Sequence, residues 1–246
     1  MGEETKTSTR VLLVSAVVLL VLLLTGPLGY NFGLVPLEPS LVSLLIALAG
    51  GILVALAGII YLIIAVRSKL AADRNLIAVA IILGLLPSIF VLPQMSRAQA
   101  VPPIHDISTD TDNPPAFVAV VPIREGAPNP VEYGTEDWPA EKLGAATREA
   151  YPDLQPIRAE MSVAEAVARS EDVLTDMGLD IVATESTEGR VEATATTFWF
   201  GFKDDLVVRV ALDDGDALID LRSKSRVGQS DIGANADRIR EFIQRF

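Results

Sequence analysis

Cysteine is absent from the 246 residues, and histidine occurs only once. Without cysteine the protein has no disulfide bond, no thiolate nucleophile and no cysteine-ligated metal. The single histidine, His105, excludes a histidine-rich metal site, and a Ser-His-Asp triad built on it would lack a nucleophile-elbow motif. The simpler role for His105 is to anchor the neighbouring chain. The sequence therefore predicts no metal site, no cofactor and no catalytic residue.

Charged residues are missing from three long apolar runs, residues 11–30, 41–66 and 75–93. Each run is close to the roughly 20 residues that cross a membrane as a helix. Buried helices of a soluble protein seldom stay uncharged over this length, so we predict three membrane spans. Because they carry no ionisable group except tyrosine, they offer no ion path or proton relay, which argues against a transporter.

Basic residues are absent from the connection 31–40, whereas Lys6 and Arg10 precede the first run and Arg67, Lys69 and Arg74 separate the second and third. Connections rich in Lys and Arg stay in the cytoplasm. The amino terminus is therefore predicted to be cytoplasmic and the carboxy-terminal part to lie across the membrane. We predict a multi-pass protein of the bacterial inner membrane with a periplasmic domain.

Two segments bear on processing. Residues 25–30 after the first run lack a small-x-small cleavage signal, so this run is predicted to be a retained anchor. The triplet Ala98-Gln99-Ala100 resembles a cleavage site that would release the tail, and an ordinary juxtamembrane linker is the favoured alternative.

Small residues share one face of the second run, at Ala47, Gly51, Ala55 and Gly58. Such a face allows close approach of another helix. Packing within the three-helix anchor is the favoured explanation, and a homo-oligomer or a membrane-protein partner is the alternative.

Negative charge is concentrated in the tail. From Arg97 onward the chain holds 15 of the 20 Lys and Arg residues and 28 of the 32 Asp and Glu residues, which gives −13 for the tail and +1 for the rest. This domain has no basic footprint for nucleic acid and is repelled by anionic headgroups. Its field suits solubility, cations or basic partners.

Proline divides the tail. Ten of the 15 prolines lie between residues 101 and 156, where periodicity is weak. We predict a transmembrane anchor over residues 1–93, a proline-rich extended arm over 94–158 that covers an edge or the open face of a sheet, and an extracytoplasmic α+β domain over 159–246.

Regular patterns resume at Ser162, which forms a capping box with Glu165 and predicts a helix to about Met177 that ends at Gly178. A second helix is predicted over 232–246, capped by Asp231 or Ser230. Between them, alternating patterns predict strands over 180–186, 190–200, 206–212 and 217–225, with turns at 188–189, 202–205 and 213–216. The predicted fold is two-layer α+β, with a four-stranded antiparallel sheet and two packed helices.

A polar stretch, residues 223–239, carries the most specific motif of the chain. It resembles the signature of the domain of unknown function 1499 (DUF1499) family, a bacterial and plastid group. Residues 200–205 resemble the second motif of that family, and residues 105–110, 114–115 and 151–153 resemble its subset with three amino-terminal spans. The resemblance implies no established activity. The matching positions are Ser225, Arg226, Gly228, Ser230, Asp231, Gly233, Asn235 and Arg238.

The same loop has the ingredients of an anion site. Gly228 and Gly233 leave backbone amides accessible to an anion, and a helix begins at this loop. Arg226 supplies a guanidinium group that can donate two hydrogen bonds. A structural alternative has Arg226 paired with Asp204 or Asp205. In that alternative the serine and aspartate after Gly228 cap the helix and an asparagine ties down the loop. The candidate ligand-binding residues are Arg226, Ser225, Ser230, Asp231, Asn235, Asp204 and Asp205.

Two neighbouring features have competing interpretations. In one interpretation, Asp204 and Asp205 act as an acid/base pair or bind a cation together. Adjacent residues on a strand point to opposite faces, however, and a tight turn between Phe202 and Leu206 is the simpler explanation for the two aspartates. The aromatic residues at 198, 199, 200 and 202 either contact the membrane interface or a lipid, or half of them pack in the core.

The sequence favours a non-enzymatic function. We expect a membrane protein whose exported domain binds a partner or a small anionic ligand, as an accessory subunit of an envelope or membrane complex. The alternative is a hydrolase or transferase acting on an envelope substrate through Asp204, Asp205, Asp231 or Arg226. This alternative fails if those side chains are consumed in mutual hydrogen bonds.

Overall fold

The computed structural model describes residues 6–246 and divides into two compact units, Met1–Ser96 and Arg97–Phe246. The first unit contains helices α1 (Thr7–Asn31) and α2 (Leu37–Arg67) and most of α3 (Ala71–Ala100). All three helices are long and apolar enough to cross a membrane. The three predicted spans are therefore confirmed as helices, each extended beyond its apolar run.

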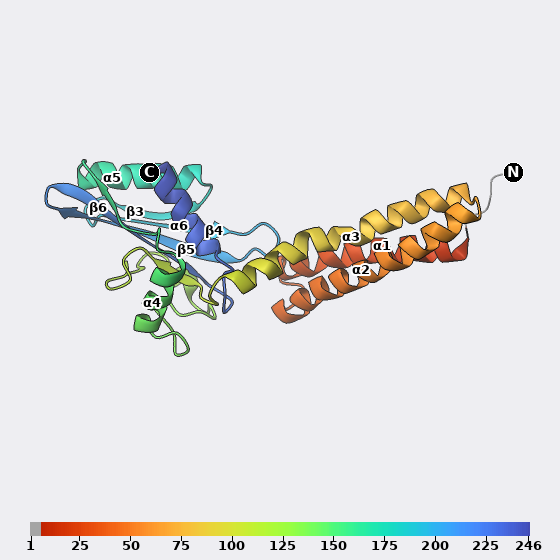
Figure 1. The fold of residues 1–246 in the computed structure, drawn as a ribbon. Coiled ribbons are helices and arrows are strands. Elements are labelled where there is room, and N and C mark those ends of the chain that lie inside the picture. The colour runs from red at the N-terminus through yellow and green to blue at the C-terminus, as the bar shows by residue number, and fades with distance from the viewer. Residues whose placement is uncertain (1–5) are drawn as a thin grey trace. The chain divides into compact units, whose positions relative to one another are not determined.

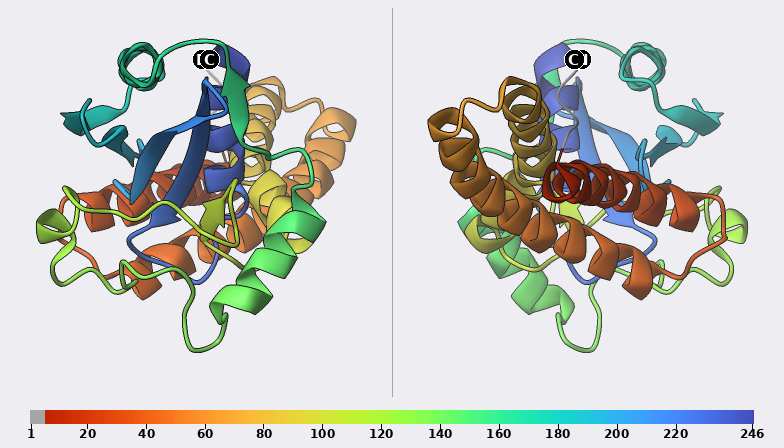
Figure 2. Two further views of the ribbon diagram at one scale, coloured as in Figure 1. Left: turned by 90° about the vertical axis from the view of Figure 1, so that its left-hand side faces the viewer. Right: turned by 90° about the vertical axis from the view of Figure 1, so that its right-hand side faces the viewer.

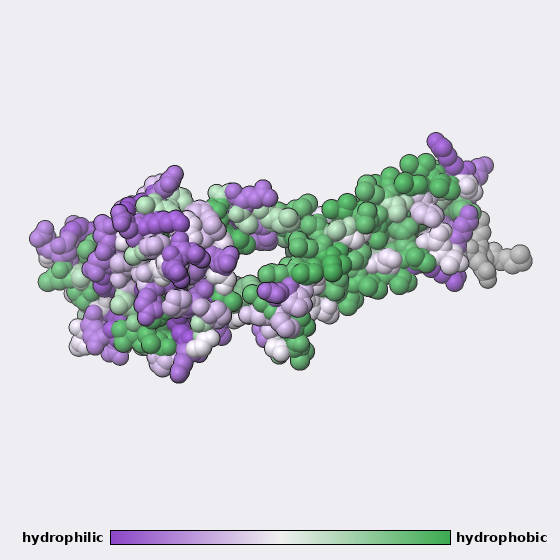
Figure 3. Space-filling model, turned by 90° about the horizontal axis from the view of Figure 1, so that it is seen from below, coloured by the Kyte–Doolittle hydropathy of each residue, from purple (hydrophilic) through white to green (hydrophobic). Residues whose placement is uncertain are grey.

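Small residues bring the anchor helices together. A Cβ atom on Gly51 of α2 would lie 2.2 Å from the carbonyl oxygen of Gly84 on α3, and one on Gly58 would lie 2.5 Å from Ile81. Ala47 and Ala55 on the same face are buried. The predicted small-residue face is thus used inside this unit, and the surface of the helices drawn in Figure 3 is mostly hydrophobic.

The second unit is built on an antiparallel sheet with the order β1-β6-β5-β4-β3, in which β2 also pairs with β6. The sheet has six strands, so the prediction of four was wrong. The strands are β1 (Asp106–Ser108), β2 (Ile157–Ala159), β3 (Asp180–Glu185), β4 (Arg190–Thr196), β5 (Lys203–Asp213) and β6 (Asp216–Ser225).

The two missed strands come from the proline-rich segment. Each has three residues, too few to show alternation, and both pair with the outer side of β6. The same segment contains the 3-10 turn η1 (Pro122–Arg124) and helix α4 (Ala140–Ala150), which the sequence analysis did not predict.

The predicted helices are present with small shifts at their ends. Helix α5 (Val163–Asp176) begins with the predicted capping box, in which the Ser162 hydroxyl accepts from the Glu165 amide and the Glu165 carboxylate accepts from the Ser162 amide. Helix α6 (Ala234–Arg245) begins two residues later than predicted, because Ile232 and Gly233 have φ values of 49° and 84°.

The two faces of the sheet are covered differently. Helices α5 and α6 lie on one side (Figure 1), where Leu206, Val208 and Leu221 enter the main apolar core. Residues 110–135 run across the opposite side (Figure 2), where Phe117 and Val120 pack on Val207. One face is therefore helical and apolar, and the other carries an irregular covering segment.

The β4–β5 connection differs from the prediction. Strand β4 ends at Thr196 instead of residue 200, and β5 begins at Lys203. Asp204 and Asp205 lie inside β5, so the predicted turn over 202–205 was wrong. Their side chains point to opposite faces of the sheet, as neighbours on a strand must. This alternation separates the two carboxylates.

Candidate functional site

The first part of the predicted site is a buried carboxylate held by two arginines. Arg226 binds Asp205 with two bonds, from Nε to Oδ2 at 2.8 Å and from Nη2 to Oδ1 at 2.7 Å. Arg124 Nη1 and Thr194 Oγ1 each donate to the same carboxylate at 2.7 Å. Every accessible lone pair of Asp205 is therefore used, and the Arg226 fork is occupied by a residue of the protein.

Burial alone would raise the pKa of Asp205, because it penalises a charge in a low-dielectric site. Hydrogen bonds from Arg226 and Thr194, together with the charges of Arg226 and Arg124, outweigh this penalty and lower the pKa below its usual value. Asp205 is therefore a fixed anion and a poor proton carrier near neutral pH.

The second part lies on the opposite face, beneath α6. Arg238 donates from Nη2 to Asp204 at 2.8 Å and from Nη1 to Asn235 at 2.7 Å. Asn235 is fully buried and donates to the Ser225 hydroxyl at 2.9 Å and to the His105 carbonyl at 3.1 Å. These bonds tie the end of β6 to the start of α6.

The loop before α6 is held by its own side chains. Asp231 accepts from the backbone amides of Gly233 at 2.8 Å and Asn235 at 2.9 Å. The Ser230 hydroxyl accepts from the amide of Ile232 at 3.1 Å. Burial raises the pKa of Asp231 although both amides favour its charged form. The amides that an anion would need are thus bound by these two side chains.

The structure brings the seven predicted site residues to one end of the sheet but divides them between its two faces. Asp205 and Arg226 lie on the face covered by residues 110–135, whereas Asp204, Ser225 and Asn235 lie toward α6. These contacts follow the structural alternative of the sequence analysis. Binding of an anion at this corner stays a prediction.

A layer of buried charge on the covered face escaped the sequence analysis. Arg222 binds Asp106 with two bonds, at 2.8 and 3.0 Å, and Lys224 Nζ lies 3.0 Å from the same carboxylate. Arg222 also lies over the rings of Phe117 and Tyr133, 4.8 and 5.3 Å from their centroids. The sequence does contain a signal for this layer: Arg222, Lys224 and Arg226 are two residues apart, and strand alternation places them on one face of the sheet.

Glu192 forms the third anion of this layer. Its carboxylate accepts from the backbone amides of Val118, Ala119 and Val120 at 2.9, 3.0 and 2.9 Å. Arg190 Nε lies 3.0 Å away. The irregular covering segment is thus attached to the sheet by charge-assisted bonds as well as by apolar contact.

His105 is the buried base that these networks leave partly unused. Its Nδ1 lies 3.3 Å from the Gln229 carbonyl oxygen, which can only accept, so Nδ1 carries the hydrogen. Nε2 therefore presents a lone pair, and within residues 6–246 it has no hydrogen-bond partner. Burial, with the charge of Lys224, lowers the pKa of His105 and keeps the ring neutral at pH 7.

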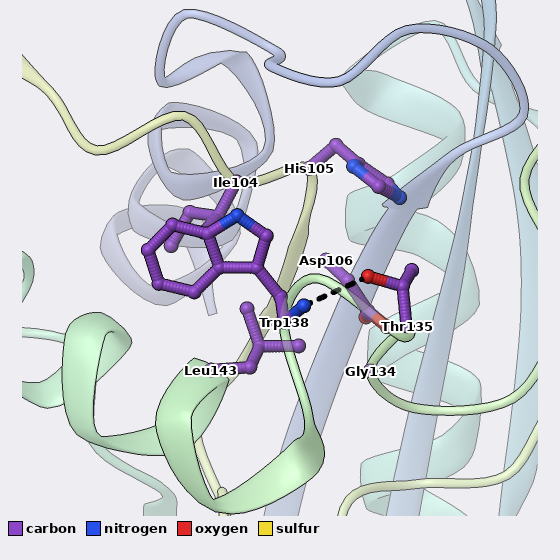
Figure 4. Close-up of a pocket in the computed structure, with 7 residues that line it drawn as sticks. All are labelled: Ile104, His105, Asp106, Gly134, Thr135, Trp138 and Leu143. Atoms are coloured by element: carbon purple, nitrogen blue, oxygen red, sulfur yellow. Dashed lines mark hydrogen bonds between the residues drawn. The ribbon is translucent and has the colours of Figure 1, made fainter.

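A small pocket lies beside His105 (Figure 4). Asp106 in its wall is already bound to Arg222 and Lys224, and the Thr135 hydroxyl accepts from the Trp138 amide at 3.1 Å. The Nε2 atom is buried and adds no exposed acceptor to the pocket, and no group of three metal-ligating side chains occurs in the described part of the chain. The lining residues are Ile104, His105, Asp106, Gly134, Thr135, Trp138 and Leu143.

Three membrane-length helices and an α+β domain latched by buried ion pairs define a protein that combines a membrane-spanning unit with a folded polar domain. The chain belongs to the family described as "Protein of unknown function (DUF1499)", whose model matches residues 106–246. The match begins at β1 and covers the whole sheet. Searches of curated proteins and of solved structures found no significant match.

Proposed function

We propose that the chain is an integral inner-membrane protein of a bacterium that presents its carboxy-terminal domain in the periplasm as a binding or interaction module. In this role it acts as an accessory subunit of an envelope or membrane complex. The single observation that carries the proposal is the mutual pairing of the motif's charged side chains, seen most clearly at Asp205 and Arg226. These groups build a rigid corner and leave none of their charge for a reaction.

The location is supported by the three apolar helices and by the distribution of basic residues. Arg67 ends α2 and Lys69 lies in the α2–α3 connection, whereas residues 32–36 between α1 and α2 contain neither Lys nor Arg. This asymmetry favours a cytoplasmic α2–α3 connection. An odd number of spans then carries the domain to the other side.

A non-catalytic role is supported by the hydrogen bonds that each candidate acid or base already makes within the protein. Asp204 is bound by Arg238, Asp205 by two arginines, and Asp231 by two backbone amides. A general acid or base must reach the reacting proton within hydrogen-bond distance. The contacts therefore weigh against the hydrolase or transferase alternative, which relied on these residues.

The contact surface in this proposal is the outer side of the motif loop. Gln229 is exposed at its tip, while its carbonyl oxygen binds His105. The motif residues on both sides of this tip hold it in place. A partner or small ligand would thus be recognised by a preorganised loop.

Purification of the full chain from native membranes in mild detergent tests this function. We expect a stoichiometric partner or ligand that is lost in the Gln229→Arg variant, because the added side chain blocks the loop tip without entering the core. Thr187→Arg, in the exposed turn between β3 and β4, is the matched control and should retain the bound molecule. A clean monomer without any bound molecule would contradict the proposal, as would turnover of an envelope substrate that Asp204→Asn abolishes.

A further inference from the structure

The loop between β4 and β5 carries four aromatic residues in a short, ordered turn. The Phe202 amide donates to the Thr197 hydroxyl, the Thr197 amide donates to the Phe202 carbonyl, and both distances are 2.9 Å. The rings of Phe200 and Phe202 stack with centroids 4.7 Å apart. The turn is therefore preorganised by its own bonds.

This turn places one large aromatic side chain in solvent. Phe198 is 85% exposed, the highest value among the large apolar side chains of the described residues, and Leu212 follows in the same unit at 67%. Residues 196–203 contain no acidic side chain, although the tail as a whole has a net charge of −13. Lys203 at the end of the turn is exposed. An apolar tip beside a cation suits the zone of lipid headgroups.

The turn lies at the end of the sheet where the chain arrives from α3. Lys203 accepts at its carbonyl from the Arg226 amide, and the neighbouring Ser225 amide donates to the His105 carbonyl. His105 follows the last turn of α3, Arg97–Ala100, which belongs to the same compact unit. Arg97 pairs with Asp237 in the first turn of α6. The aromatic turn, the motif loop and the end of α3 therefore share one end of the domain (Figure 1).

A short tether joins the domain to the third apolar run. The third apolar run stops at Pro93, and α3 continues as a helix to Ala100. Seven helical residues span about 10 Å at 1.5 Å each. The interfacial layer on each side of the hydrocarbon core is about 5–7 Å thick. A tether of this length lets the domain reach the headgroups.

From these observations we propose that the turn Thr197–Phe202 is a second membrane contact. Phe198 and Trp199 insert among the phospholipid headgroups of the membrane that the helices cross, and Lys203 faces phosphate. Ile123, 51% exposed, lies at the same end through the bond of its carbonyl with Arg226 and adds apolar surface. The contact orients the domain with its motif loop toward the bilayer. It requires only the membrane anchor and holds on either side of the membrane.

Lipid is favoured over a protein partner because the anchor supplies the bilayer at high local concentration. Aromatic side chains also prefer the boundary between headgroups and acyl chains. A protein partner would have to compete with a surface that is always within reach.

Tryptophan fluorescence of the full chain in phosphatidylcholine vesicles tests the contact. The chain has two tryptophans, so Trp138→Phe leaves Trp199 as the only reporter. We expect lipids brominated near the headgroup to quench most of its emission, and we expect Phe198→Ser to reduce that quenching. Unquenched, water-like emission from Trp199 in pure lipid would overturn the proposal and leave the turn to a protein partner.

The matched control is the other end of β5. Leu212 lies roughly 30 Å along the strand from the aromatic turn, at about 3.4 Å per residue. Leu212→Trp, combined with Trp138→Phe and Trp199→Phe, should not be quenched, and equal quenching at both ends would overturn the end-on contact.

A measurement that leaves Trp138 intact guards against misfolding of the first variant. Nitroxide labels on the single-cysteine variants Phe198→Cys and Leu212→Cys report collision with lipid-soluble oxygen. The label at residue 198 should collide more often than the label at 212. Equal collision rates would contradict the contact.

Discussion

The two compact units of this protein differ in which residues they mostly bury. In the anchor the buried positions are mostly small, such as Ala16, Ala47 and Ala80, and large Val, Leu and Ile side chains face outward. In the domain the buried positions hold Leu206, Ile219 and Phe242, together with charged side chains in bonded clusters. The anchor is arranged for a hydrocarbon solvent and the domain for water.

This difference indicates where chemistry can occur. Lipid does not drive large apolar side chains inward, so close approach of small residues holds the helices together. In water, apolar burial supplies most of the stability, and the domain can also bury charges if each is bonded. The charged and hydrogen-bonding groups that can recognise another molecule are therefore concentrated in the domain.

Asp205→Ala is expected to cause the largest loss of stability, and this loss should be confined to the domain. The substitution leaves the buried Arg124 and the partly buried Arg226 without their shared anion, which costs about 3–5 kcal/mol of domain stability. Denaturant unfolding of the full chain in detergent, followed by domain tryptophan fluorescence, measures the loss. Asp112→Ala, which breaks an exposed pair with Arg148, is the control and should leave the transition almost unchanged. Similar curves for both variants would contradict the importance of buried pairing.

An intermediate effect is expected in the anchor from Gly51→Ala. The new Cβ would meet the Gly84 backbone oxygen at 2.2 Å, so α2 and α3 must separate, at a cost of about 1–3 kcal/mol. Gly50→Ala is the neighbouring control, because its Cβ meets only the end of the flexible Leu19 side chain. Unfolding in mixed detergent micelles should weaken the helical unit in the first variant and spare the domain. Equal stability of the two variants would show that the close approach is unimportant.

The smallest effect concerns pH and the only histidine. Burial lowers the pKa of His105, so the unfolded state binds a proton more readily than the folded state. The contribution of neutral His105 to the free energy of unfolding is therefore fully present above pH 6.5, the ordinary histidine pKa. It is lost as the pH falls from there through the pKa of the folded state. The domain of the native chain should become less stable as the pH falls below 6.5, whereas His105→Gln should show a flatter profile. A profile unchanged by the substitution would contradict a buried, neutral His105.

Sequence patterns predicted the elements whose signals are local. The Ser162 capping box, the hairpin at residues 213–216 and the three apolar helices were predicted because each depends on neighbouring residues. Strands β1 and β2 were not, because three residues each become strands only by pairing with distant β6. Tertiary pairing decided these segments where local periodicity gave no signal.

The sequence placed the candidate residues at one strand-to-helix corner, but it did not give their bonding partners, and ligand binding there stays a prediction. Asp231 and Asn235 do meet at the start of α6, whereas Arg226 lies on the other face of the sheet, where it binds Asp205. The Arg124–Asp205 pair joins residues 81 positions apart through the covering segment, which shows no regular pattern. The lone pair of His105 depends on a single carbonyl at Gln229, and no sequence pattern marks such a contact.

The most direct test of the central claim is the accessibility of single cysteines. Because the chain has no cysteine, each of the variants Leu34→Cys, Ser68→Cys and Ser186→Cys carries one thiol at an exposed position. In spheroplasts, whose outer membrane is removed and whose inner membrane is intact, a membrane-impermeant maleimide should label residues 34 and 186. It should label residue 68 only after the inner membrane is permeabilised. Labelling of residue 68 with protection of residue 186 would place the acidic domain in the cytoplasm and contradict the account.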